Sequence, residues 1–146
     1  MSPLYLLFIV IASFIFAKLE IEIEGAHGWA AELPTWRVEK HVLLDIFFGG
    51  RPLTGYHAWA FAFVLCMFHT PLFLSGSWSW RREAYAVGGY ALFWIVEDFL
   101  WFVLNPHFGW KKFSPENIWW HKRWFLKLPV DYWVFGGAGI ALLTLA

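Results

Sequence analysis

The stretch AYAVGGYALFWIVEDFLWFVLN, residues 84–105, decides the fold class. It is apolar over a length that crosses a hydrocarbon core of about 30 Å when it forms a helix rising about 1.5 Å per residue. Glu97 and Asp98 interrupt it roughly 11 Å from the Asn105 end, where a lipid-exposed carboxylate would cost about 3 kcal/mol. We therefore predict a membrane helix that turns these acids toward protein or water, or keeps a proton on one of them.

Three further apolar segments cover residues 3–19, 55–74 and 130–146. The chain of 146 residues is 60% hydrophobic and contains 12 Trp and 16 Phe, more than the core of a soluble domain of this size buries. The sequence therefore predicts an all-α integral membrane protein, a four-transmembrane-helix bundle that forms a single membrane domain over residues 1–146. Eleven Lys and Arg balance eleven Asp and Glu, so no basic excess points to a nucleic acid, and membrane lipids are the expected partners.

Small residues mark the third and fourth segments. Gly88-Gly89 lies in the third segment, and the fourth contains GGAG at residues 136–139. Small side chains let membrane helices approach closely. We therefore predict that the third and fourth segments pack together.

The basic residues predict the orientation in the membrane. Arg81 and Arg82 stand in the short connection between the second and third segments, and the other nine of the eleven Lys and Arg stand in the two long connections. Basic residues are retained preferentially on the cytoplasmic side. We expect a multi-pass protein of the cell inner membrane, with both long connections in the cytoplasm and both termini outside.

Both long connections carry signs of local structure. In the first, hydrophobic spacing favours an interfacial helix over residues 35–48 that ends at Gly49-Gly50, but the alternating LEIEIE at residues 19–24 allows a short β-hairpin with residues 35–39 instead. In the second, Ser114-Pro115-Glu116 has the pattern of a helix start and predicts an interfacial helix over residues 114–128.

Glu97 and Asp98 are the candidate catalytic residues, as proton donors or metal ligands. Trp101 and Asn105 follow Glu97 at a spacing of four and share its helical face. Aromatic faces at such a site could stabilise a carbocation or a polyene. The expected ligand-binding residues are His57, Trp94, Trp101, Asn105 and Trp124. The alternative role of the acids is structural, as partners of backbone or histidine groups that hold the bundle together.

A metal site is a further expectation. The topology brings several histidines to the side of the two acids, and imidazole and carboxylate groups suit iron, zinc or manganese. The spacing contains no HExxH or repeated histidine box, and interfacial histidines also bond lipid phosphate or backbone groups. The expected ligands are His27, His57, Glu97, His107 and His121.

These residues predict a polar pocket at the cytoplasmic leaflet that binds a lipid or isoprenoid, with or without a metal ion, and supports acid-type catalysis. Whether the protein is an enzyme stays open at this point. The competing hypothesis is a non-catalytic accessory or scaffold subunit of a larger membrane complex, or a homo-oligomer, which would use its Gly-rich and Trp-rich faces to pack on neighbours.

Four motifs resemble those of an uncharacterised family of small polytopic prokaryotic membrane proteins. They are EIEIEG at 20–25, GWAAELPTWR at 28–37, GGRPLTGYH at 49–57 and VEDFLWFVLNP at 96–106. The resemblance covers most of the chain and implies a multi-pass membrane protein, but it brings no activity with it.

A second resemblance is local. IVEDFLWFV at residues 95–103 is similar to the acidic helix motif of the lycopene cyclase domain, where adjacent acids precede aromatic residues in a membrane helix. It implies that Glu97 and Asp98 protonate a polyene. The chain departs from that motif at Ile95, where the family has a proline just ahead of the acids.

Overall fold

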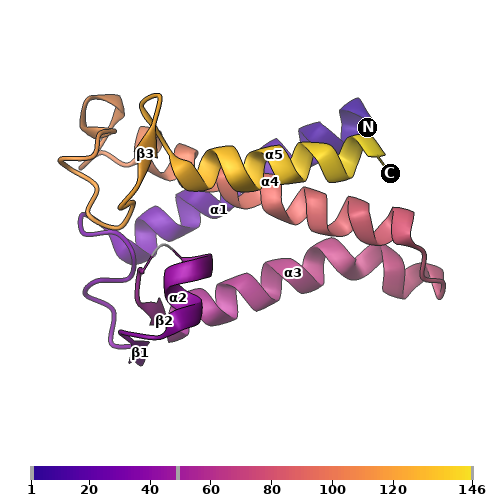
Figure 1. Ribbon diagram of the computed structural model, residues 1–146, viewed down its shortest axis with the longest axis horizontal. Coiled ribbons are helices and arrows are strands. Elements are labelled where there is room, and N and C mark those ends of the chain that lie inside the picture. The colour runs from indigo at the N-terminus through magenta and orange to yellow at the C-terminus, as the bar shows by residue number, and fades with distance from the viewer. Residues whose placement is uncertain (1, 49, 146) are drawn as a thin grey trace.

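The central acidic stretch forms helix α4, Trp80–Leu104, which lies among the other long helices of the computed structural model (Figure 1). It begins four residues before the predicted start, because Ser79 caps it by accepting a hydrogen bond from the Arg82 backbone N–H. Glu83 adds a favourable acid to the first turn. Arg81 and Arg82 therefore lie in this turn rather than in the connecting loop.

The structure describes residues 2–48 and 50–145, and three more of its helices correspond to the other predicted segments. They are α1, Pro3–Glu24; α3, Gly55–Ser75; and α5, Val130–Leu145. α1, α3 and α4 are long and apolar enough to cross a membrane, whereas α5 is apolar but shorter. The predicted last residue of the fourth segment, Ala146, lies outside the described residues. The fold is thus mostly helical, and its long apolar helices indicate a membrane protein.

α1 continues five residues beyond its predicted end, so the alternating LEIEIE stretch is helical. Glu20 and Glu24 lie four residues apart on one helical face, and the buried Glu20 accepts a hydrogen bond from the Tyr56 hydroxyl. Glu22 lies on another side of the helix and is exposed. The predicted β-hairpin with residues 35–39 is wrong, because the helix buries two of these glutamates and leaves the third outside, whereas a strand would put all three on one side.

The first long connection contains one short helix and two short strands. These are β1, Arg37–Val38; α2, Val42–Phe47; and β2, Leu53–Thr54. β1 pairs antiparallel with β2, and the His41 side chain caps α2. The predicted interfacial helix over residues 35–48 is therefore wrong in its first half, because that half pairs as a strand. Gly49, in its predicted end, lies outside the described residues.

The second long connection is not helical as predicted over residues 114–128. Its elements are the 3-10 helix η1, Trp110–Lys112, and the antiparallel strands β3, Trp124–Phe125, and β4, Leu128–Pro129. Leu126 and Lys127 turn the chain between the strands with left-handed φ angles of 48° and 65°. Ile118 and His121 are buried against the helices. The predicted helix does not form because Ile118 and His121 fill space among the helices, which a helix lying flat in the headgroup region would leave empty.

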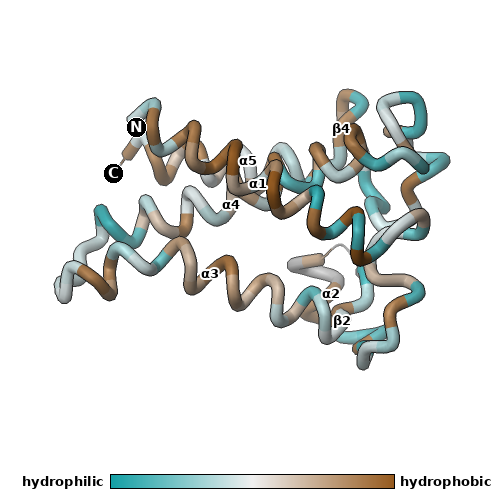
Figure 2. Tube along the Cα trace, turned by 180° about the vertical axis from the view of Figure 1, so that it is seen from behind, coloured by the Kyte–Doolittle hydropathy of each residue, from teal (hydrophilic) through white to brown (hydrophobic). Residues whose placement is uncertain are grey.

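α4 packs against α1, α3 and α5. Both chain ends lie at one end of the bundle and both long connections at the other, here called the connection end (Figure 1). Many hydrophilic residues lie at the connection end, and away from it α1 and α5 are mainly hydrophobic, whereas α4 is of intermediate hydropathy (Figure 2). One hydrophobic cluster, around Trp101, Phe102 and Trp120, lies at the connection end, and a second, around Phe68 and Phe93, lies nearer the chain ends.

Glycines let α4 and α5 approach closely, as the sequence predicted. A Cβ atom built on Gly139 would lie 3.0 Å from the Gly88 carbonyl oxygen and 2.9 Å from Cγ of Leu92. A Cβ atom on Gly88 would in turn lie 3.0 Å from the Gly139 carbonyl oxygen. The prediction that the third and fourth segments pack together is confirmed.

Replacing Gly139 with alanine is expected to lower the free energy of unfolding by about 1–3 kcal/mol, because the new methyl group overpacks against α4. Gly137→Ala is the matched control, since no described atom lies within 4 Å of a Cβ built there. Alanine in a helix should leave that control unchanged or up to about 1 kcal/mol more stable. Thermal melting of both variants in one detergent tests this, and equal melting temperatures would contradict the close approach.

Candidate functional site

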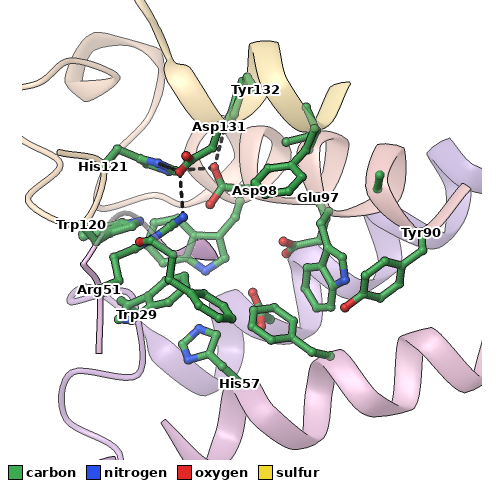
Figure 3. A pocket seen from close by; sticks show the side chains of 18 of the residues that line it. Trp29, Arg51, His57, Tyr90, Glu97, Asp98, Trp120, His121, Asp131 and Tyr132 are labelled. Carbon is green, nitrogen blue, oxygen red and sulfur yellow. Dashed lines mark hydrogen bonds and ion pairs between the residues drawn. The ribbon is translucent and has the colours of Figure 1, made fainter. Parts of the chain in front are cut away.

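A cavity of about 390 Å³ lies between α3 and α5, and side chains of α4 line a third side of it (Figure 3). Its connection end is polar and includes glutamates from α1 and α4, and histidines from α3 and the second connection. Farther along α4 its lining is apolar. That part is formed by Val87, Tyr90, Ala91, Trp94 and Ile95 of α4 and Phe135 of α5, which all keep partial exposure or more. The cavity is therefore amphipathic, a polar chamber continued by an apolar groove along the flank of the bundle.

Asp98 belongs to a buried charge network at the polar end (Figure 3). Its Oδ2 lies 3.0 Å from Nε2 of His121 and accepts a hydrogen bond from the Tyr132 hydroxyl. Nδ1 of His121 lies 3.5 Å from Oδ2 of Asp131, which also accepts a 2.7 Å bond from Nη2 of Arg51. Arg51 is only 7% exposed. The two aspartates thus have cationic or hydroxyl partners in the folded state.

His57 and Trp29 link this network to α1. Nδ1 of His57 lies 2.7 Å from the Thr54 hydroxyl, and its Nε2 lies 3.5 Å from Oε1 of Glu24. The His57 ring stacks on Trp29 at a centroid distance of 4.1 Å. The Arg51 guanidinium lies 4.5 Å from the centroid of the same indole. Trp29 is therefore held by a cation and an imidazole, and its N–H donates to the Pro52 carbonyl at 2.8 Å.

Glu97 differs from Asp98 in having an unpaired oxygen. It is 2% exposed, and among the described residues its Oε1 has no hydrogen-bond partner. Its side chain lies within hydrogen-bonding range of the Glu20 carboxyl. The indole N–H groups of Trp94 and Trp101, which also line the cavity, likewise lack partners among the described residues. Buried polar atoms are rarely left unpaired, so this group of atoms is the part of the cavity best suited to a ligand.

The structure brings together most of the predicted site residues. His57, Trp94, Glu97, Asp98, Trp101 and His121 all line the cavity. Asn105 and Trp124 instead support it from outside. The Asn105 amide donates to the Gly25 carbonyl at 2.8 Å and ties the end of α4 to the end of α1, whereas the Trp124 indole donates to the His121 carbonyl at 2.7 Å.

The predicted metal ligands are not gathered into one site. His27 is exposed and pairs with Glu32 at 3.1 Å, and His107 is exposed on the loop after α4. His57 and His121 have separate carboxylate partners. In the described part of the chain, no group of three or more His, Cys, Asp or Glu side chains is arranged to hold a metal ion. The expected iron, zinc or manganese site therefore has no ligand set there.

Several cavity residues were not among the predicted site residues. Glu20 and Glu24 carry a signal that could have found them, because a spacing of four puts both on one helical face. Arg51 and Asp131 carry no such signal, since they lie 80 residues apart and meet only in the folded chain. Tyr132 follows Asp131 at the start of α5 and also carries no local signal. It belongs to the site because its hydroxyl donates a hydrogen bond to Asp98.

His121 lies outside the membrane-crossing helices and has a raised pKa. Burial by itself lowers the pKa of this imidazole, but the charge of Asp98, the nearby Asp131 carboxylate and a hydrogen bond to Asp98 together outweigh burial. Protonated His121 therefore stabilises the fold fully below its ordinary pKa of about 6.5, and this contribution is lost as the pH rises through the raised value.

We expect the melting temperature of the wild-type protein to fall as the pH rises above about 6.5, and to fall less in the His121→Gln variant. His27→Gln is the control, because His27 pairs with Glu32 at the surface and should leave the pH profile unchanged. Melting curves from pH 6 to 9, at about half-unit steps, test this. Parallel profiles for wild type and His121→Gln would contradict the protonation of His121 in the network.

No family model, curated protein or solved structure matches this chain.

Proposed function

We propose that this chain is a four-span membrane protein that holds the polar end of a lipid or isoprenoid in the cavity between α3 and α5. The observation that carries the proposal is that polar atoms of Glu97, Trp94 and Trp101, which have no hydrogen-bond partner within residues 2–48 and 50–145, lie next to an apolar groove along α4. A hydrocarbon chain lying in that groove would replace lipid or water against Val87 and Ile95, while its polar end reached Glu97. At about 390 Å³ the cavity suits one end of a long chain rather than the whole of it.

The proposal includes acid-type chemistry, with Glu97 as the proton-active group. Asp98 is already paired with His121 and accepts a hydrogen bond from the Tyr132 hydroxyl. Glu97 lies beside Glu20 and has one carboxyl oxygen without a partner among the described residues, so its carboxyl is the one available to a ligand.

In such a step the Glu97 carboxyl would transfer its proton to a carbon–carbon double bond, which leaves a carboxylate and a carbocation. The faces of Trp94 and Trp101 would stabilise that cation. Loss of a proton from a neighbouring carbon to the carboxylate would restore a double bond at a new position and regenerate the acid. No oxidant or reductant is needed.

The orientation is part of the same proposal. α5 has 16 residues and spans about 24 Å, and tilting or local thinning of the bilayer would let it cross with α1, α3 and α4. The two long connections share one end of the bundle, with nine of the eleven basic residues, and would face the cytoplasm (Figure 1).

A reporter fused after the C-terminus tests this orientation. Alkaline phosphatase is expected to be active there and a fluorescent protein dark, because the first needs the outside and the second the cytoplasm. The same reporters placed in the Ser75–Ser79 turn should behave alike, since that turn lies at the same end as the C-terminus (Figure 1). Reversed signals at the C-terminus would overturn the orientation.

Mass spectrometry of co-purified lipids tests the proposed binding. The wild-type protein, purified in mild detergent, is expected to carry one lipid or isoprenoid species enriched over the bulk membrane. Glu97→Gln should lose much of this enrichment, because its amide replaces one carboxyl oxygen with an NH2 group that cannot accept a hydrogen bond from the ligand. Glu22→Gln is the matched control, since it neutralises an exposed glutamate of α1 and should retain the species.

Bulk lipid alone in wild type, Glu97→Gln and Glu22→Gln would overturn the proposal. A stoichiometric protein partner found in the same preparations would then support an accessory subunit instead. Gel filtration of each variant shows whether it is folded, so that loss of ligand is not confused with loss of structure.

A further inference from the structure

The charges that line the cavity are unequal in number. Carboxyl side chains come from Glu20, Glu24, Glu97, Asp98 and Asp131, whereas among the described lining residues Arg51 is the one with a permanent positive charge. Figure 3 shows Arg51 and Asp131 at one side of the chamber and Glu97 at another.

The positive groups are already occupied. Arg51 donates from Nε to the Phe48 carbonyl at 2.8 Å and from Nη2 to Asp131 at 2.7 Å, and its guanidinium lies over Trp29. His121 lies between Asp98 and Asp131. The cations of the cavity are thus committed to the two aspartates.

The three glutamates have weaker partners. Glu20 accepts from the Tyr56 hydroxyl at 3.0 Å, and Glu24 accepts from the backbone N–H of Ala30 and lies 3.5 Å from His57. Glu97 is only 2% exposed, and within the described chain its Oε1 has no hydrogen-bond partner. A group that enters this chamber therefore meets carboxyl oxygens that accept hydrogen bonds, and among the described lining residues it meets no guanidinium that is not already paired.

We infer that the cavity selects amphiphiles whose polar end donates hydrogen bonds and is uncharged or cationic, such as a hydroxyl or an amine, and rejects those that end in phosphate. This inference rests on the proposed function and names the ligand class for the same cavity. A hydroxyl donates to Glu97 and accepts from an indole N–H of Trp94 or Trp101, so it pairs atoms that have no partner in the part of the chain that the structure describes.

A phosphate would have the opposite effect. It brings only acceptors and negative charge into a chamber whose guanidinium is paired with Asp131, and it would have to lose its water to enter. Like charges brought together at a binding site weaken binding strongly. The same cavity should therefore distinguish ligands that share one hydrocarbon chain but differ in their ends.

Four probes with the same class of C20 chain test this. Phytanol, phytanylamine, phytanyl phosphate and the hydrocarbon phytane are titrated into delipidated full-length protein, and the dissociation constants are measured by native mass spectrometry. The alcohol and the amine are expected to bind at least about tenfold more tightly than the phosphate, and also more tightly than phytane. Glu97→Gln should narrow the gap between alcohol and phosphate, and Glu22→Gln should leave it unchanged.

The outcomes separate the inference from the proposed function. The inference would be overturned if the phosphate bound as tightly as the alcohol, or if phytane bound as tightly as the alcohol and the amine. Either result would still leave a lipid-binding cavity in place. Failure of all four probes to bind would overturn the proposed function itself. The comparison among probes uses wild-type protein, so the test stands even where the Glu97→Gln variant does not fold.

Discussion

Replacement of Arg51 with alanine is expected to destabilise the protein by about 3–5 kcal/mol. The guanidinium is 7% exposed and pairs with Asp131 at 2.7 Å, so its removal leaves a carboxylate at the cavity with only His121 beside it. Denaturant or thermal unfolding in a single detergent measures the loss.

Two further variants show whether this loss comes from the ion pair. Lys111→Ala removes an exposed cation from the same end of the bundle and should change stability by no more than about 0.5 kcal/mol. The double variant Arg51→Met, Asp131→Leu removes both charges and should recover part of the loss, since apolar residues can replace a buried ion pair. A single Arg51→Ala variant as stable as wild type would show that the pair does not hold the first connection to α5.

Filling the apolar groove is expected to remove the bound lipid or isoprenoid. Ala91 lines the groove on α4, and a tryptophan there would occupy space that the proposed hydrocarbon chain needs. Because the change leaves every polar residue of the chamber in place, it tests the groove separately from Glu97. Lipid mass spectrometry of the Ala91→Trp variant should detect only bulk membrane lipid.

Ala62→Trp is the control for this change. Ala62 is exposed on α3 and does not line the cavity, so a tryptophan there should face lipid and leave the bound species unaffected. Retention of the enriched species by Ala91→Trp, or its loss from both variants, would mean that the groove along α4 is not where the chain lies.

The long helices were predictable because a membrane imposes strict requirements on the chain. Every backbone polar group in hydrocarbon must be paired internally, so an apolar stretch of sufficient length has few alternatives to a helix. α3, Gly55–Ser75, ends within one residue of its prediction, and α4 ends just before the Asn105-Pro106 stop. The one error at a helix start is that of α4, where the Ser79 cap extends the helix beyond its apolar part.

The connections were less predictable because their local signals fit more than one structure. Ser114 does begin a turn, since the Ile118 backbone N–H donates to its carbonyl, but the turn does not continue into a helix. Tertiary contacts of Ile118 and Trp120 with the core decide the path instead. The stretch LEIEIE likewise alternates with a period of two, which is typical of a strand, but it forms part of α1, and this helix buries Glu20.

The candidate site was predictable in several of its lining residues but not in how these residues pair with one another. Glu97 and Asp98 could be identified because they are adjacent acids in an apolar stretch. The sequence of their own helix does not show that Asp98 is paired and that Glu97 has an oxygen left unpaired by the described residues. His121 and Tyr132, which occupy Asp98, come from elements 23 and 34 residues away. Long-range partners of this kind are fixed by the packing of α5 and the second connection, which no local pattern encodes.

Photo-crosslinking from within the cavity tests the central claim most directly. A benzoyl-phenylalanine is placed at Phe61, which lines the cavity on α3, or at Phe14, an exposed residue of α1 outside it, and the protein is irradiated in its own membrane. We predict one discrete lipid or isoprenoid adduct from position 61 and a mixture of bulk membrane lipids from position 14. The same mixture of bulk lipids from both positions would contradict a cavity that holds a specific amphiphile.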